Sequence, residues 1–221
     1  KRHTYLMNSN NFEYLKNAVT KVFIENHILI SIDIEAFETN TYIIIELGLT
    51  IYDPRFQLST LNPSFQKIHL IPSEVFEFRN GLFITDNKFK FIGESIILTF
   101  EKCAILMQVI INYYFTELDY PCSLVGHNVC GDIKWLKELG VRFPENHSII
   151  DTQDLWTTSF GTETSSLGNV LRILNIPHSN LHNAGNDSYF TLILAMNLSD
   201  PLYRINNKLD SIEFIENIKK K

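Results

Sequence analysis

The sequence predicts one α/β domain in which a central mixed five-stranded sheet is flanked by helices. Three observations lead to this class. The chain has 221 residues, of which 45% are hydrophobic, enough to bury a sizeable core. Short runs rich in β-branched residues alternate with longer runs in which apolar residues recur with a helical period. The elements follow the order β-β-β-α-β-α-β-α-α, which is typical of a mixed sheet with helices packed on it.

Five segments are expected to form the strands. The first is an isoleucine-rich run, and the second ends at the turn-forming pair Asp53-Pro54. Three of the strands follow one another directly along the chain, which favours an antiparallel meander. The five segments cover residues 27–38, 41–53, 65–71, 122–127 and 148–156.

Helices are expected where apolar residues recur every three or four positions. Residues 11–24 carry such a stripe and are expected to pack on the core ahead of the first strand. Residues 95–115 are expected to contain a helix with Ala104, Met107, Ile110 and Ile111 on one stripe. The remaining helices are expected at residues 132–140, 166–174 and 187–198.

The chain is expected to divide into an N-terminal helical segment, one core domain and a C-terminal extension. Residues 1–27 form the first part, residues 28–200 the second and residues 201–221 the third. Within the core domain, residues 72–94 are polar and aromatic and show no period, which predicts a surface insertion at the rim of a binding site.

The insertion also carries three basic residues, Arg79, Lys88 and Lys90. Two interpretations stay open for them. They contact phosphate groups of a ligand, or they are solvated charges of an ordinary exposed loop.

Composition narrows the class of protein. The net charge of −6 argues against a protein that coats nucleic acid, because such binding rests on many basic contacts to phosphate. The three cysteines form no C-x-x-C pair, which indicates buried small hydrophobic residues and neither disulfides nor a zinc finger. No run is long and apolar enough for a membrane span, so we expect a protein without a membrane partner.

An intracellular location, cytoplasmic or nuclear or both, is expected from the lack of a secretory signal. The chain begins with Lys instead of Met, which indicates that it is trimmed from a longer protein. A mitochondrial location therefore stays open.

The first candidate site residues are two acids in the stretch "ISIDIEAF". Side chains on a strand alternate between faces, so Asp33 and Glu35 emerge together on one face. By itself this pattern also fits a strand with a polar outer face. The isoleucines around the acids favour a central strand, where two ionised carboxylates are costly unless cations compensate them.

A third acid follows the fourth strand in "VGHNVCGDIKWL". Asp132 begins a helix, where an acid is also favoured simply by the helix dipole. His127 and Asn128 stand at the end of the strand, where they hold the loop or face a ligand.

The last candidates lie in "LHNAGNDSYF". His182 precedes Asp187 by five residues around a flexible centre, and Asp187 begins an apolar helix. In isolation, Asp187 is explained as a capping residue and His182 as a loop histidine. Gly185 between them is expected to let the chain turn so that both side chains face one phosphate.

The order of these motifs resembles the DEDDh exonucleases of the ribonuclease H-like superfamily. Asp-x-Glu comes on the first long strand, then Asp after "HN", then His-x4-Asp at the last core helix, and the match runs from about residue 28 to 198. The stretches "GHNVCGDIKWLKELG" and "IPHSNLHNAGNDSYFTL" resemble a fungal subgroup with a yeast member associated with mRNA export. Ser188 departs from the alanine usual after the last acid. The resemblance implies a ribonuclease H-like fold.

The resemblance also implies a set of roles. Asp33, Glu35, Asp132 and Asp187 would hold two divalent cations, with Asp33 bridging them, and His182 would be the general base. Hard carboxylate oxygens fit Mg²⁺ or Mn²⁺. An imidazole changes its charge near neutral pH and so can take a proton from the attacking water.

Substrate contacts are expected along the backbone after Asp33. The resemblance places Ile34, Ala36 and Phe37 near the terminal nucleotide, and we include His127 and Asn128 in the same set. Phe37 either stacks on a base or packs in the core.

The expected function is metal-dependent 3′–5′ exonuclease activity on single-stranded nucleic acid, with RNA slightly preferred over DNA. The alternative is a ribonuclease H-like scaffold with weak or no catalysis, which binds RNA or a protein in mRNA metabolism. Four converging carboxylates favour the enzyme, because a scaffold has no physical need for them.

Overall fold

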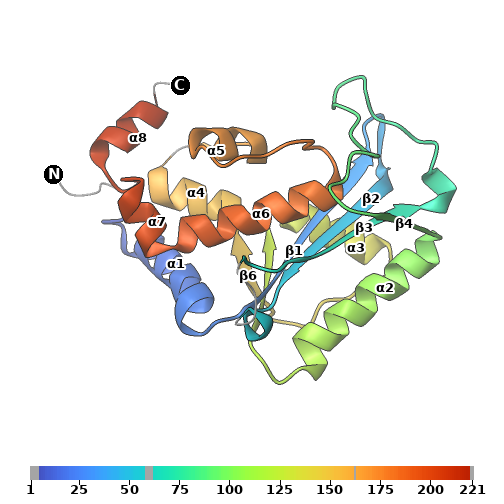
Figure 1. Cartoon of the computed structure of the whole chain (residues 1–221), viewed down its shortest axis with the longest axis horizontal. Helices are drawn as coiled ribbons and strands as arrows, with labels where there is room; N and C mark the ends of the chain where they lie inside the picture. The colour runs from blue at the N-terminus through green and yellow to red at the C-terminus, as the bar shows by residue number, and fades with distance from the viewer. Residues whose placement is uncertain (1–4, 58–61, 162, 220–221) are drawn as a thin grey trace.

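The computed structural model describes residues 5–57, 62–161 and 163–219. It shows a six-stranded mixed sheet, in the order β4-β3-β2-β1-β5-β6, with helices on both faces (Figure 1). The α/β class and the central mixed sheet are thus confirmed, with one strand more than predicted. The strands are β1 (Ile28–Phe37), β2 (Asn40–Tyr52), β3 (Gln66–Pro72), β4 (Ser95–Leu98), β5 (Cys122–Gly126) and β6 (Ser148–Asp151).

The first three strands form the antiparallel meander that the sequence predicts. β5 runs parallel to β1, and β6 runs parallel to β5. The additional strand is β4, which pairs in parallel with β3. No strand was predicted at these residues, because "SIIL" continues into the apolar run that was expected to contain a helix. The boundary is Thr99, whose side chain accepts the backbone N–H of Lys102 and begins the helix.

Eight α-helices lie among the described residues. Their bounds are α1 (Ser9–Val19), α2 (Phe100–Asn112), α3 (Cys130–Glu138), α4 (Thr152–Phe160), α5 (Leu167–Ile173), α6 (Ala184–Ser199), α7 (Pro201–Asn206) and α8 (Ile212–Ile218). The prediction that residues 148–156 form one strand was wrong beyond Asp151. The Asp151 side chain accepts the N–H of Gln153, so the chain turns into α4 directly after a short strand.

The two faces of β1 belong to two separate cores. Leu29 packs with helices α1, α4, α5 and α6 on one side of the sheet. Ile28 and Ile30 pack with α2 and α3 on the other side. Figure 1 shows α6 lying across the first face and α2 beneath the second. The acids of β1, which alternate with these isoleucines, therefore face α6.

The insertion at 72–94 contains a short 3-10 turn, Ser73–Val75, and otherwise runs as an irregular loop before β4. Neither interpretation of Lys88, as a phosphate contact or as a solvated charge, was right. Its side chain is 1% exposed, and the ammonium group donates to the carbonyl oxygens of Val75, Phe76 and Phe78. Lys88 therefore holds the insertion together from inside, and it is not available to a ligand.

Arg79 also has a partner within the insertion, because it pairs with Asp86 at 2.5 Å. Among the cysteines, only Cys103 is fully buried, and Cys130 is exposed, so the prediction of three buried thiols was wrong for Cys130. None of the described helices combines the length and apolar character that a membrane span requires.

Candidate active site

The first two acids lie on β1 and leave the same face of the sheet, as the alternation predicts. Asp33 and Glu35 are half-buried, and Ile32 and Ile34 beside them are buried on the opposite face. β1 pairs with β5 only over Ile28–Ser31. Beyond that point the β5 side of β1 has no neighbouring strand among the described residues. The acids therefore lie where the sheet leaves an open edge.

Asp132 reaches this open edge from the first turn of α3. Its Oδ1 accepts the backbone N–H of Ile34 at 2.9 Å, and its side chain is buried. Ile34 lies between Asp33 and Glu35 in the chain. The hydrogen bond therefore places a third carboxylate beside the other two. The helix dipole alone therefore does not account for Asp132, because its side chain also joins α3 to β1.

Asp187 lies in the first turn of α6, yet the residue that caps this helix is Asn183. The Asn183 side chain accepts the N–H of Asn186, whereas Oδ2 of Asp187 accepts the N–H of His182 at 2.9 Å. Oδ1 of Asp187 is buried and has no hydrogen-bond partner among the described residues. Because a buried carboxylate oxygen without a partner is destabilising, this atom points to a ligand that completes the site.

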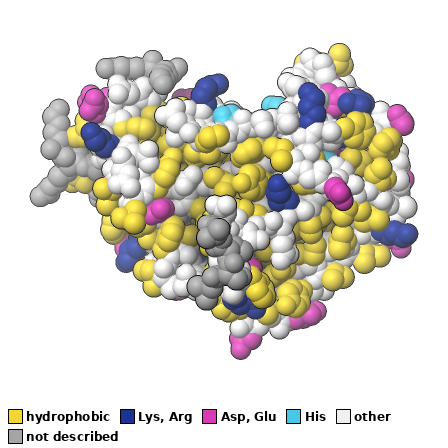
Figure 2. All heavy atoms as spheres, in the orientation of Figure 1, with side chains coloured by type: hydrophobic (Ala, Val, Ile, Leu, Met, Phe, Trp, Pro, Cys, Tyr) yellow, Lys and Arg dark blue, Asp and Glu magenta, His cyan; other side chains and the backbone are white. Residues whose placement is uncertain are grey.

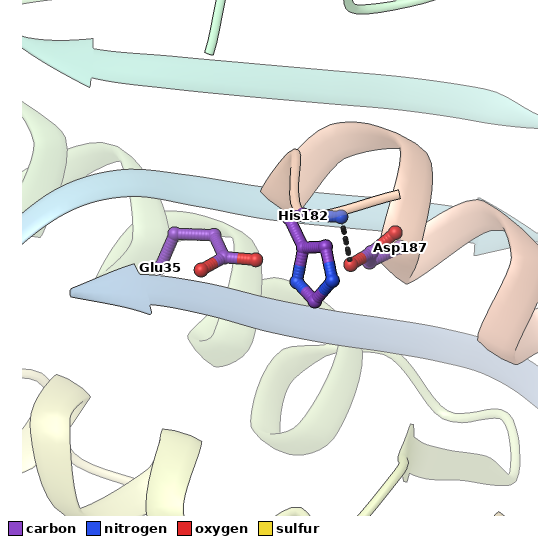
Figure 3. Close-up of side chains that lie close together, drawn as sticks. All are labelled: Glu35, His182 and Asp187. Atoms are coloured by element: carbon purple, nitrogen blue, oxygen red, sulfur yellow. Dashed lines mark hydrogen bonds between the residues drawn. The ribbon is translucent and has the colours of Figure 1, made fainter. Parts of the chain in front are cut away.

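Among the described residues, Glu35, His182 and Asp187 form a group whose ligand atoms could hold one metal ion, and Asp33 and Asp132 are not part of this group. One ligand atom of each lies within 4.8 Å of the others. Figure 3 shows Glu35 on its strand with the carboxylate directed toward the His182 ring, and Asp187 on the adjacent helix turn. His182 is exposed, and its φ of +61° lies in the left-handed region. The hydrogen bond to Asp187 stabilises this unfavourable backbone conformation.

A buried carboxylate that the sequence analysis did not assign holds the start of α6 in place. Glu46 on β2 is 2% exposed, and its Oε2 lies 2.8 Å from Nε2 of His69 and 3.0 Å from Nδ2 of Asn183. The Nδ1 atom of His69 in turn lies 2.8 Å from Oγ of Ser95. The signal was present in the sequence, because an acid within the apolar run "IIIELGL" must find a partner when it is buried.

Close contact between α6 and β2 holds the start of α6, which carries Asp187, against the strand that pairs with β1. Asp33 pairs in register with Gly48, and a Cβ on Gly48 would lie 1.8 Å from the carbonyl oxygen of Ala184. Only glycine permits this approach. Four residues into α6, the hydroxyl of Ser188 lies 2.9 Å from that of Thr50. The departure from alanine at this position thus adds a hydrogen bond between the same two elements.

Burial raises the pKa values of all four acids, and the charges of neighbouring acids add to the effect. Burial, followed by the charges of Asp187 and Asp132, holds the pKa of Asp33 well above its usual range. Burial and the charge of Asp187 do the same for the pKa of Glu35. Burial raises the pKa of Asp132 to about 7, against the opposing N–H of Ile34. Burial also raises the pKa of Asp187 to about 7. Ionising these buried, neighbouring carboxylates is therefore unfavourable in free energy, and bound cations would offset this effect.

The donor set suits divalent cations. Carboxylate oxygens come from three elements of the fold, and one of them is the buried Oδ1 of Asp187 that lacks a partner among the described residues. Oxygen ligands of this kind select hard ions such as Mg²⁺ and Mn²⁺. The residues present therefore fit such ions, with His182 at the exposed side of the group.

The residues of β1 that were expected to contact substrate differ in whether their side chains are accessible. The side chains of Ile34 and Ala36 are buried, so these residues present only their backbones, and the carbonyl oxygen of Ala36 accepts a hydrogen bond from Asn80. The half-buried ring of Phe37 packs edge to face with Phe78 of the insertion at 5.1 Å. Phe37 therefore belongs to a small aromatic contact between β1 and the insertion.

His127 and Asn128 hold the loop after β5. The ring nitrogens of His127 lie 2.8 Å from Oγ1 of Thr152 and 2.7 Å from the carbonyl oxygen of Ser165. The backbone N–H of Asn128 donates to Asp151, and burial lowers the pKa of His127. These contacts favour the loop-holding interpretation over direct contact with a ligand, and they fix the approach to α3.

Comparison with known proteins identifies a family and several relatives. Residues 28–198 match the family model described as "DNA polymerase III subunit epsilon-like, C-terminal domain" of the DEDDh type. The fold is similar to a solved structure, a zinc-bound form of Escherichia coli ExoI in complex with ssDNA. That similarity has a TM-score of 0.53 at 13% identity over 88% of this chain and 43% of the other.

Two fungal relatives share more of the sequence. "Good for full DBP5 activity protein 2" of Saccharomyces cerevisiae is 39% identical over 92% of this chain and 41% of its own length. "Uncharacterized nucleolar protein C2C4.08" of Schizosaccharomyces pombe is 31% identical over 83% of this chain and 70% of its own length. The chain spans less than half the length of the Saccharomyces relatives that it matches. On the family match and these relatives, the chain belongs to the DEDDh family of the ribonuclease H-like superfamily.

Proposed function

We propose that this protein is a metal-dependent 3′–5′ exonuclease that hydrolyses single-stranded nucleic acid. The observation that carries the proposal is the buried Oδ1 of Asp187, which lacks a partner among the described residues in a group where Glu35 and His182 approach within 4.8 Å. Membership of the DEDDh family supports nuclease chemistry on this scaffold.

The proposed ligands of two divalent cations are Asp33, Glu35, Asp132 and Asp187. Mg²⁺ and Mn²⁺ are the proposed ions, because the set offers carboxylate oxygens and no thiolate. When bound, two such ions activate a water molecule and stabilise the leaving oxygen of a phosphodiester. The contacts of Asp132 with Ile34 and of Asp187 with His182 keep two of the carboxylates oriented for this role.

His182 is the proposed general base. Its side chain is exposed next to Glu35 and Asp187, so a water molecule can reach the imidazole. An imidazole nitrogen takes the proton of the attacking water while the new O–P bond forms and the bond to the 3′ oxygen breaks. The products are a nucleoside 5′-monophosphate and a strand shortened by one nucleotide.

RNA is the proposed substrate class, on the resemblance to the fungal subgroup that includes an mRNA-export member. The ExoI relative by fold is described with ssDNA, which supports a single strand as the form that is bound. A nuclear location is supported by the Schizosaccharomyces relative that is named as nucleolar.

A second candidate is a scaffold that binds RNA or a protein partner without efficient catalysis. It is favoured by the Saccharomyces relative named for full DBP5 activity, a name that refers to the activity of another protein. The two candidates differ in one observable, which is whether a bound strand is cut.

The test uses one single strand labelled at its 5′ end and the same strand labelled at its 3′ end, each incubated with Mg²⁺ or Mn²⁺. We expect a ladder of 5′-labelled products and early release of the 3′ label as a mononucleotide. Asp33→Ala and His182→Ala should abolish or strongly reduce both the ladder and the release of the 3′ label. Asp119→Asn and His178→Ala change an exposed acid and an exposed histidine outside the site and serve as matched controls. Intact wild-type strands would exclude the enzyme, and binding without cleavage would favour the scaffold.

A further inference from the structure

The tip of the insertion, residues 80–84, is fixed to the end of β1. The carboxylate of Glu38 accepts the backbone N–H groups of Leu82, Phe83 and Ile84 at 2.7, 2.8 and 3.0 Å. Asn80 accepts the N–H of Glu38 at 2.9 Å. Because several hydrogen bonds to one carboxylate hold the backbone of this tip, they also fix where its side chains project.

The far end of the same insertion is bonded to the loop that carries His182. Nδ2 of Asn87 donates to the carbonyl oxygen of Leu181 at 2.6 Å, directly before His182. Asn183 donates to the carbonyl oxygen of Lys88 at 3.0 Å. The insertion thus bridges the end of β1, which carries Glu35, and the loop that carries His182.

Two neighbouring apolar side chains stand exposed on the fixed tip. Leu82 is 76% exposed and Phe83 is 83% exposed. Single exposed apolar residues are ordinary, but here two are consecutive, and their backbone is locked by Glu38. The edge-to-face pair of Phe37 and Phe78 continues the apolar surface back toward the end of β1.

The tip lies close enough to the acids to contact a nucleic-acid strand whose 3′ end is bound there. Glu38 lies three residues beyond Glu35, so at most about 11 Å of extended chain separates Glu35 from the residue that holds the tip. That distance is about three stacking intervals of about 3.4 Å between bases. Figure 2 shows a hollow along the upper edge of this face, with histidines on its rim and Lys or Arg side chains on both shoulders, next to Asp or Glu side chains.

We propose that Leu82 and Phe83 form a stacking surface for bases a few nucleotides upstream of the 3′ end that is bound at the acids. The proposal rests on the proposed nuclease function and adds the part of the substrate that the tip contacts. Bases are the suitable occupant because any base offers a flat face to an aromatic ring, so contact does not depend on sequence. Tip contacts of this kind favour long strands over mononucleotide substrates.

The test compares Leu82→Ala/Phe83→Ala with a control, Phe56→Ala/Leu202→Ala, which removes side chains that are 63% and 69% exposed elsewhere. Two substrates are used, a 5′-fluorescein single strand of 20 nucleotides and the p-nitrophenyl ester of a nucleoside 5′-monophosphate, which is too short to reach the tip. We expect KM for the long strand to rise about 5- to 30-fold in the tip variant, with kcat and hydrolysis of the ester unchanged. The control should match the wild type.

Glu38→Gln provides a second variant that keeps both apolar side chains. It weakens the acceptor of three N–H groups, so we expect a smaller rise in KM for the long strand and again no effect on the ester. A tip variant with wild-type KM for the long strand would overturn the proposal. Equal losses on both substrates would also overturn it, because the tip would then act on the acids themselves.

Binding separates a failure of this proposal from a failure of the nuclease function. If the wild type cuts neither substrate, the nuclease proposal falls, and fluorescence anisotropy of the 20-nucleotide strand in EDTA still tests the tip. We then expect the Kd to rise by the same 5- to 30-fold factor, about 1–2 kcal/mol. An unchanged Kd would overturn the stacking surface and leave the tip for a protein partner.

Discussion

The carboxylate of Asp187 accepts the backbone N–H of His182 at 2.9 Å, while its other oxygen is buried without a partner among the described residues. One acid therefore fixes the loop of the proposed base, and its second oxygen is the one that we propose binds a cation. This relationship explains why the two residues lie five positions apart. The spacing lets the chain leave the left-handed conformation at His182 and begin α6 with Asp187 in its first turn.

Gly48→Ala tests the approach of α6 to β2. A Cβ at this position would lie 1.8 Å from the carbonyl oxygen of Ala184, so the first turn of α6 must move. We expect a loss of about 1–3 kcal/mol in the free energy of unfolding and a large loss of nuclease activity, measured by urea titration and by strand cleavage. Gly131→Ala is the control, because a Cβ on Gly131 would extend into open space. Equal behaviour of the two variants would contradict the contact.

The pH dependence of stability without divalent ions follows from the raised pKa values. Asp132 and Asp187 have pKa values of about 7 when folded, against 3.8 when unfolded. The folded state therefore binds protons more tightly, and its stability falls as the pH rises from about 4 to about 7. In EDTA, we expect the Tm to decrease from pH 5 to pH 8 and Mg²⁺ or Mn²⁺ to restore it at pH 8.

The matched variant for this experiment is Asp187→Asn, which removes one of the charges and should flatten the dependence on pH. Asp119→Asn, on the surface, should leave it unchanged. A wild-type Tm in EDTA that stays level or rises between pH 5 and pH 8 would contradict the account of crowded carboxylates.

Asn87→Ala tests whether the insertion positions His182. The variant loses the hydrogen bond to the carbonyl oxygen of Leu181, so the following histidine gains freedom. We expect kcat to fall about 10-fold with KM nearly unchanged, because a misplaced base slows the chemical step more than binding. Asn207→Ala removes a comparable side-chain bond to a backbone carbonyl far along the chain and should have no effect on kcat. A kcat equal to that of the wild type would show that the insertion does not position the base.

Asn183→Ala removes both the cap of α6 and its link to Glu46. The loss of the cap costs about 1 kcal/mol, and the partners left unsatisfied add about 1–2 kcal/mol. Ser211→Ala removes only the cap of α8 and should cost about 1 kcal/mol. Chemical denaturation and cleavage rates measure the two effects. Activity should fall only for Asn183→Ala, and a similar profile for both variants would argue against a role of this network in the site.

The face shared by Asp33 and Glu35 could be predicted from the sequence, because strand alternation is a local property. Prediction of the whole site also depended on the order of the three motifs, which suggested that Asp132 and Asp187 belong to it. Contacts such as that between Asp132 and Ile34 could not be predicted, because they depend on where β5 ends relative to β1.

The features that the sequence does not predict depend on contacts between distant segments. Glu46 and His69 meet because neighbouring strands pair in one register, and nothing local in either segment specifies that register. β4 was not predicted because its four residues continue into the apolar run of α2 without a local boundary signal. The role of Lys88 follows from three carbonyl groups that converge only in the folded insertion.

The central claim is that the four acids form a site for divalent cations, and a calorimetric titration with Mn²⁺ tests it most directly. It is performed in the presence of a nucleoside 5′-monophosphate, which supplies the phosphate oxygens of the proposed product. We predict saturable binding of two ions to the wild type and to Asp119→Asn, and weakened or incomplete binding to Asp187→Asn. A wild-type protein that binds no Mn²⁺, or an Asp187→Asn variant that binds it as the wild type does, would contradict the account.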